Sequence, residues 1–132
     1  MERWIEELKG QIPKGNYNIS YCSGEEGYTV KLIDQSNQID VEIDFGIVYA
    51  LQVLDKESFV KSLDKKVCNE FMKDNFSNVI YKVENGCFYK QINENSSELL
   101  DFIGLTHYVV IGLKSVIESL TYEIGHITTL ER

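Results

Sequence analysis

Three carboxylates at alternate positions are the most distinctive chemical feature of this sequence. Asp40, Glu42 and Asp44 alternate with apolar residues, so in a β-strand they project from one face, with roughly 7 Å between neighbours. Such a row could receive Lys or Arg side chains from a basic partner or hold a cation. Ca²⁺ usually takes about 6–8 oxygens from a folded loop, and a straight strand presents too few. The alternative is a solvated sheet face that discourages edge-to-edge aggregation.

Two other features extend this candidate partner-binding surface. Glu25 and Glu26 lie in the polar turn between the first two expected strands, where they add to the negative charge. The chain also has 8 tyrosines, a residue type that often anchors protein interfaces. Tyr89 fits the apolar pattern of its segment less well than the others, so we expect it to be exposed.

Cys87 and His107 suggest one catalytic hypothesis. If Asn85 caps a helix, Cys87 lies in its first turn, where the helix dipole lowers the pKa of a thiol. With His107 nearby, the two would form a nucleophile–base pair. The alternative is a small residue packed at a helix start, and nothing in the sequence brings the two side chains together. We therefore expect no enzymatic activity.

The acidic composition restricts the partner. Thirteen Lys and Arg residues against 21 Asp and Glu residues give a net charge of -8. Such a chain repels phosphate backbones and anionic membranes, so we expect neither a nucleic acid nor a membrane as partner. A basic protein fits this charge, and a homo-oligomer stays open. No His, Cys, Asp or Glu cluster has metal-ligand spacing, and no glycine-rich phosphate loop is present, so we expect no metal and no cofactor.

Cysteine usage and hydropathy indicate a cytoplasmic protein. Cys22, Cys68 and Cys87 lie far apart without redox or metal spacing, as expected of reduced thiols. Residues 1–12 lack a secretory pattern, because two glutamates follow Trp4 and Ile5 directly. No apolar run approaches the ~20 residues of a membrane span.

Apolar periodicity predicts an N-terminal helix followed by three strands. Met1, Trp4, Ile5, Leu8 and Ile12 share one helical face, and residues 10 and 13, Gly and Pro, are stop signals. From residue 17 the period changes to two, which predicts strands at 17–22, 28–32 and 38–45 joined by polar turns.

The register of the second hairpin follows from keeping apolar residues opposite one another. Pairing Val30 with Val41 and Leu32 with Ile39 meets this condition. It also places Lys31 opposite Asp40 as a favourable cross-strand charge pair. The three strands are then an antiparallel meander with one wet and one apolar face.

The second half predicts three strand–helix units, at 47–54 with 56–73, 79–83 with 87–95, and 107–113 with 114–123. Asp55 can cap the first helix and Asn85 the second. Asn85-Gly86 is also a type I′ hairpin signal, which would make residues 87–92 a strand. We favour the helix because the neighbouring units have helices at the equivalent place. Residues 126–130 could add a short edge strand.

Three stretches carry a resemblance to known proteins: residues 45–55, residues 78–85, and residues 107–111 ahead of 115–118. They resemble small uncharacterised α+β proteins of Gram-positive bacteria, including immunity proteins of polymorphic toxin systems, over roughly residues 40–123. The resemblance implies a protein that binds and neutralises a toxin, and it transfers no catalytic residue. At Gly86-Cys87 this chain departs from such proteins, which have a charged residue after the asparagine.

Together these features predict a single α+β domain over residues 1–132. We expect an N-terminal helix and an antiparallel β-meander continuing into a mixed sheet, with helices packed mainly on one face. The expected function is that of a non-enzymatic cytoplasmic binding protein, an immunity protein whose acidic face occludes the active site of a basic toxin domain. The alternatives are an adaptor or regulatory module with another partner and a small enzyme.

Overall fold

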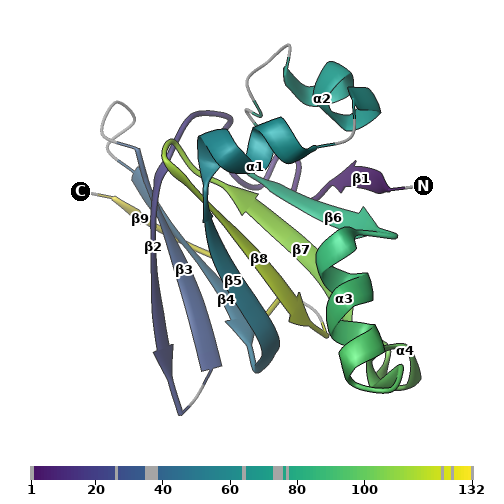
Figure 1. Cartoon of the computed structure of the whole chain (residues 1–132). Coiled ribbons are helices and arrows are strands. Elements are labelled where there is room, and N and C mark those ends of the chain that lie inside the picture. The colour runs from purple at the N-terminus through teal and green to yellow at the C-terminus, as the bar shows by residue number, and fades with distance from the viewer. Residues whose placement is uncertain are drawn as a thin grey trace.

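Two antiparallel β-sheets packed face to face dominate the computed structural model (Figure 1). The structure describes residues 2–25, 27–34, 39–63, 65–72, 76, 78–122, 124, 125 and 127–131. The described chain is thus mostly β, with short helices, and the expectation of a meander continuing into one mixed sheet is wrong. Every strand pair in both sheets is antiparallel.

The five-stranded sheet has the order β1-β6-β7-β8-β5. Its strands are β1 (Arg3–Glu6), β5 (Val48–Asp55), β6 (Ile80–Glu84), β7 (Thr106–Ile111) and β8 (Ser115–Thr121). The four-stranded sheet has the order β2-β3-β4-β9. Its strands are β2 (Asn18–Gly24), β3 (Gly27–Asp34), β4 (Ile39–Gly46) and β9 (Ile127–Glu131).

Short helices cover the outer face of the five-stranded sheet. They are α1 (Lys56–Ser62), α2 (Lys65–Phe71), α3 (Cys87–Asn95) and α4 (Leu99–Ile103). Phe59 of α1 and Phe71 of α2 pack with β7 and β8, while Phe88 of α3 and Leu100 of α4 pack on Leu120 further along β8. None of these described helices has the length and apolar character needed to span a membrane.

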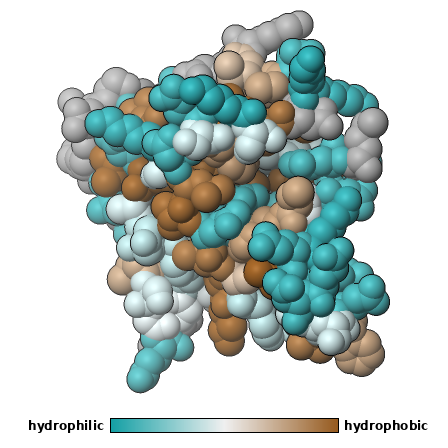
Figure 2. All heavy atoms as spheres, in the orientation of Figure 1, coloured by the Kyte–Doolittle hydropathy of each residue, from teal (hydrophilic) through white to brown (hydrophobic). Residues whose placement is uncertain are grey.

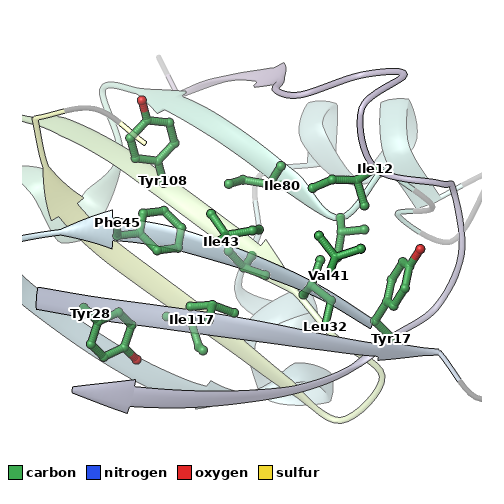
Figure 3. Packing of buried hydrophobic residues seen from close by; sticks show 13 residues of the cluster. Ile12, Tyr17, Tyr28, Leu32, Val41, Ile43, Phe45, Ile80, Tyr108 and Ile117 are labelled. Carbon is green, nitrogen blue, oxygen red and sulfur yellow. The ribbon is translucent and has the colours of Figure 1, made fainter. Parts of the chain in front are cut away.

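The main core lies between the two sheets. Alternate residues of β3 and β4, such as Leu32, Val41 and Ile43, are fully buried there. They meet Ile80 and Ile117 from the facing sheet, as Figure 3 shows. The period-2 pattern of the sequence therefore predicted correctly which faces of β3 and β4 are apolar.

The register of the β3–β4 hairpin differs from the expected one by two residues. Val41 pairs with Leu32 rather than Val30, and Lys31 lies opposite Glu42 rather than Asp40. A shift of two residues keeps every side chain on its own face. Hydrophobic matching therefore cannot distinguish the two registers.

The predicted N-terminal helix is wrong, since the first element is the strand β1. Pairing with β6 places Trp4 opposite Val83, and Trp4 is 5% exposed. Its ring centroid lies 5.2 Å from that of Tyr81 and 5.9 Å from that of Phe59. A positive φ of 54° at Leu8 is incompatible with a continuing α-helix. Burial among aromatic rings therefore outweighs the helical spacing of the apolar residues.

The helix predicted at residues 114–123 is the strand β8, paired with β5 and β7 on either side. Val116, Ile117 and Leu120 are all completely buried. A central strand covered on both faces loses its alternation, and its apolar residues can then mimic helical spacing.

Other local predictions are confirmed. The side chain of Asp55 caps α1 by accepting a hydrogen bond from the Ser58 backbone N–H at 3.0 Å. A helix rather than a hairpin strand follows Asn85, although the N-cap is Gly86 and no side chain caps it. The strand β9 occupies the expected C-terminal position and pairs with β4.

Candidate protein-binding site

The acidic row on β4 is less available than the sequence predicts. Asp40, Glu42 and Asp44 project from the outer face of the four-stranded sheet, but Asp40 is only 7% exposed. The Nζ atom of Lys31 lies 3.6 Å from the Oδ2 atom of Asp40. Lys31 itself pairs with Glu42 across the hairpin. One lysine of the same chain therefore offsets much of the charge at this end of the row.

Asp44 serves the turn that follows β4. Its Oδ1 atom accepts a hydrogen bond from the Gly46 backbone N–H at 2.8 Å, and its carbonyl oxygen accepts one from Gly125 at 2.7 Å. The strand itself lies between β3 and β9, so the row is not at a sheet edge. Glu42, which is partly exposed, is the member of the row best placed to meet a partner.

The remaining predicted partner-binding residues separate in space. Glu25 is exposed at the tip of the β2–β3 hairpin, and Glu26 lies outside the described residues. Tyr89 is only partly exposed, and its hydroxyl donates a hydrogen bond to Asp101 Oδ1 at 2.6 Å. Burial, together with this bond to Asp101, raises the pKa of Tyr89 to about 12. Tyr89 therefore joins α3 to α4, and the expectation of a freely exposed tyrosine is wrong.

An apolar groove opens between the two sheets, next to Glu25. It has a volume of about 550 Å³ and lies between the β2–β3 hairpin tip and the start of β5. Its lining consists of Tyr21, Ser23, Gly24, Glu25, Gly27, Tyr28, Ile47, Val48 and Leu51. The volume falls within the range of small ligand or side-chain pockets.

Backbone geometry at two glycines forms the corner of this groove. Gly27 has φ +128°, and a Cβ added there would lie 2.7 Å from the carbonyl oxygen of Gly46. Gly46 itself has φ +64° and begins the turn through which the chain leaves one sheet for the other. The buried hydroxyl of Thr121 holds this turn and lies 2.7 Å from the carbonyl oxygen of Ile47. Only glycine at position 27 permits so close a backbone approach.

Two stacked tyrosines form one wall of the groove. The ring centroids of Tyr21 and Tyr28 are 5.6 Å apart with an interplanar angle of 22°. Tyr21 is 54% exposed, whereas Tyr28 is 6% exposed and its hydroxyl has no hydrogen-bond partner among the described residues. Desolvation, and secondarily the neighbouring Tyr21, raises the pKa of Tyr28, so the hydroxyl stays neutral. A buried hydroxyl without a partner is costly, so a hydrogen-bond donor at this oxygen would be favourable.

The groove continues along β5, which is an edge of the five-stranded sheet. No residue of β5 is fully buried, and Val53 and Tyr49 are 41% and 50% exposed. Figure 2 shows hydrophobic residues gathered over this strand on the face displayed there. Val48 and Leu51 of β5 also line the groove, so edge and groove form one continuous surface.

The cysteine–histidine pair is not formed. The Nε2 atom of His107 lies 2.8 Å from Glu118 Oε1, and Gln52 donates a hydrogen bond to the other oxygen of this carboxylate. The Nδ1 atom of His107 has no hydrogen-bond partner among the described residues, so Cys87, which is exposed, does not bond to it. His107 thus belongs to a buried polar group across β7, β8 and β5.

Sequence reasoning missed Glu118, Gln52 and most of the groove. Glu118 lay in a segment expected to be helical, where its neighbours across the sheet cannot be foreseen. The one usable signal for the groove was the pair of tyrosines flanking the Glu25 turn. Among the described residues, no group of three or more His, Cys, Asp or Glu side chains could hold a metal ion.

No family model, no curated protein and no solved structure matches this chain.

Proposed function

We propose that this chain is a non-catalytic protein-binding domain that pairs the edge strand β5 with an extended segment of its partner. The observation that carries the proposal is an edge strand of 8 residues without an internal charge, with exposed apolar side chains and an adjoining aromatic groove.

The other sheet edges in the described chain differ from β5. Strand β1 has 4 residues with Arg3 and Glu6 at its ends, and β9 has 5 residues. Strand β2 presents the exposed polar residues Asn18 and Ser20. By contrast, β5 contains no Lys, Pro or Gly, and its one charged residue, Asp55, is its last. Its one irregularity is a register shift between Val48 and Ala50, which leaves residues 50–55 as a regular edge. Proteins generally protect long apolar edges, so an edge without internal charges is typical of a strand that a partner completes.

Strand addition supplies both affinity and selectivity. The unpaired N–H and C=O groups of an edge strand form main-chain hydrogen bonds with an extended peptide, and alternate side chains enter neighbouring pockets. A register shift between Val48 and Ala50 interrupts the regular alternation of β5, so that Val48 and Leu51, three positions apart, both line the groove. A partner segment can therefore bind the edge and the groove together.

The charge of the chain indicates a basic partner. The net charge is -8, Glu25 stands at the groove, and Glu42 remains partly exposed on the outer face. Such a charge accelerates association with a cationic protein. The resemblance to immunity proteins gives a basic toxin domain as the partner class, and an adaptor role with another basic protein would use the same surface.

A pair of matched lysine substitutions tests the proposal. Val53→Lys places a charge on the exposed edge of β5, and Ser20→Lys makes the same charge change on the exposed edge strand of the other sheet. The probe is a display library of random peptides bound to the full chain, followed by affinity measurement on the selected peptides. We expect basic peptides with alternating apolar residues, whose affinity falls by about tenfold or more in Val53→Lys and is retained in Ser20→Lys.

Two results would refute the proposal. One is peptide binding that responds equally to both lysine variants. The other is a dimer of the isolated chain that Val53→Lys dissociates in native mass spectrometry, because a second copy would then occupy β5.

A further inference from the structure

The groove beside β5 has the chemistry of a site for one cationic side chain. Among the described residues that line it, Glu25 is the only charged one and none is Lys, Arg or His. The aromatic wall of Tyr21 and Tyr28 faces an apolar lining from Ile47, Val48 and Leu51. A long side chain with an apolar stem and a positively charged end is complementary to this apolar, aromatic and acidic lining.

The unpartnered hydroxyl of Tyr28 decides between an apolar occupant and a polar one. Tyr28 is only 6% exposed, and its hydroxyl has no hydrogen-bond partner among the described residues. A leucine or phenylalanine entering the groove would desolvate the carboxylate of Glu25, which costs free energy. It would also give the Tyr28 oxygen no hydrogen bond, so an occupant that donates hydrogen bonds is favoured.

We infer that the groove binds the side chain of an arginine carried by the partner segment. The guanidinium group stacks on the exposed face of Tyr21, donates a hydrogen bond to the Tyr28 hydroxyl and forms an ion pair with Glu25. The hydroxyl is covered in the unbound chain, so binding includes a shift of the exposed Tyr21 ring. Its methylene groups cover Ile47. Arginine fits better than lysine because its planar group stacks on aromatic rings and has five donors in a fixed arrangement.

The inference rests on the proposed function, since pairing with β5 is what brings the arginine to the groove. Side chains of an added strand alternate between the two faces of the sheet. Those on the face shared with Val48 and Leu51 point toward the groove. One such position, at the level of the Glu25 turn, is the predicted arginine position.

A ligand too short to form a strand tests the groove alone. The probes are N-acetyl-arginine methylamide and its neutral isostere N-acetyl-citrulline methylamide, observed through the methyl NMR signals of Ile47, Val48 and Leu51 of the full chain. At low salt we expect saturable shifts with the arginine compound and about tenfold weaker binding of the citrulline compound, because a charge-assisted bond is lost.

Three variants make the test specific. Glu25→Gln removes the carboxylate charge and Tyr28→Phe removes the acceptor, so each is expected to weaken arginine binding about fivefold to tenfold. The control Ser20→Ala, on the opposite face of β2 from Tyr21, leaves the affinity unchanged. Equal binding of the two compounds, or arginine binding unaffected by both groove variants, would overturn the inference.

The outcome separates this inference from the proposed function. Val53 does not line the groove, so Val53→Lys should weaken binding of the amide much less than binding of the peptides, whose strand pairing it blocks. If peptides bind β5 but the arginine compound fails, only the arginine site is wrong. If the arginine compound binds but Val53→Lys does not weaken peptide binding, the groove stands and the strand pairing is wrong.

Discussion

Replacing Gly27 by alanine should destabilise the protein strongly, because two independent constraints act at this position. A Cβ would lie 2.7, 2.8 and 2.9 Å from three backbone atoms of Gly46, none of which can rotate away. The backbone φ of +128° is also one that other L-residues rarely adopt. We estimate roughly 1–3 kcal/mol for the backbone strain at position 27 and about 1–3 kcal/mol for displacing the Gly46 backbone. The expected loss is thus about 2–6 kcal/mol, a large part of the stability of a domain.

Gly24 provides the matched control, since it pairs with Gly27 in the same hairpin. A Cβ at Gly24 meets nothing within 4 Å, and its φ is ordinary. Gly24→Ala should therefore leave stability nearly unchanged or raise it by about 0.4–1 kcal/mol through the unfolded state.

Urea unfolding measures both variants in one assay. The single tryptophan, Trp4, is 5% exposed in the cluster beneath α1 and α2, so its fluorescence reports unfolding far from the substitution. If the two variants differ by less than about 0.5 kcal/mol, a typical scatter for neutral substitutions, the close approach of the hairpin to the Gly46 turn is refuted. A folded Gly27→Ala variant should also bind the arginine amide more weakly, because the corner of the groove must shift.

Three further predictions concern individual side chains. Gly86→Ala should lower the free energy of unfolding in urea by about 1–3 kcal/mol. The added Cβ would lie 2.6 Å from Nδ1 of His107, although the backbone φ of −74° is ordinary. An unchanged urea midpoint would show that the imidazole ring can move. Tyr28→Phe should leave the melting temperature unchanged or raise it, because it removes a buried hydroxyl without a partner, and a clear fall would mean that the hydroxyl already has one. Because the pKa of Tyr89 is raised to about 12, the folded state holds this proton more tightly, so stability falls as the pH rises from about 10 towards 12. Urea midpoints over this pH range should fall less steeply in Tyr89→Phe, which also lacks the bond to Asp101, and identical slopes would contradict the assignment.

The acidic row shows how far local pattern reaches for the candidate site. Alternation placed Asp40, Glu42 and Asp44 on one face correctly, because the side-chain period of a strand is a local property. Their availability depends on neighbours that the pattern does not contain. Lys31 lies diagonally beside Asp40, and the turn at Gly46 takes up Asp44.

Local signals also explain which elements were predicted correctly. The strands β3 and β4, the Asp55 cap of α1 and the helix α3 follow from residues adjacent in the chain. The segments around Trp4 and at β8 were predicted wrongly because their apolar residues fit either period. Pairing with β6, and with β5 and β7, decided the outcome through contacts between residues distant in the sequence.

The strand periods, the acidity and the turn residues were therefore predictable from the sequence alone, since each depends on a few consecutive residues. The order of the strands within the two sheets was not predictable in this way. That β5 is an edge, and that its start lies beside the tip of the β2–β3 hairpin, results from packing two sheets against each other. The exposed edge and its groove exist only because hydrophobic burial over the whole chain selected that arrangement.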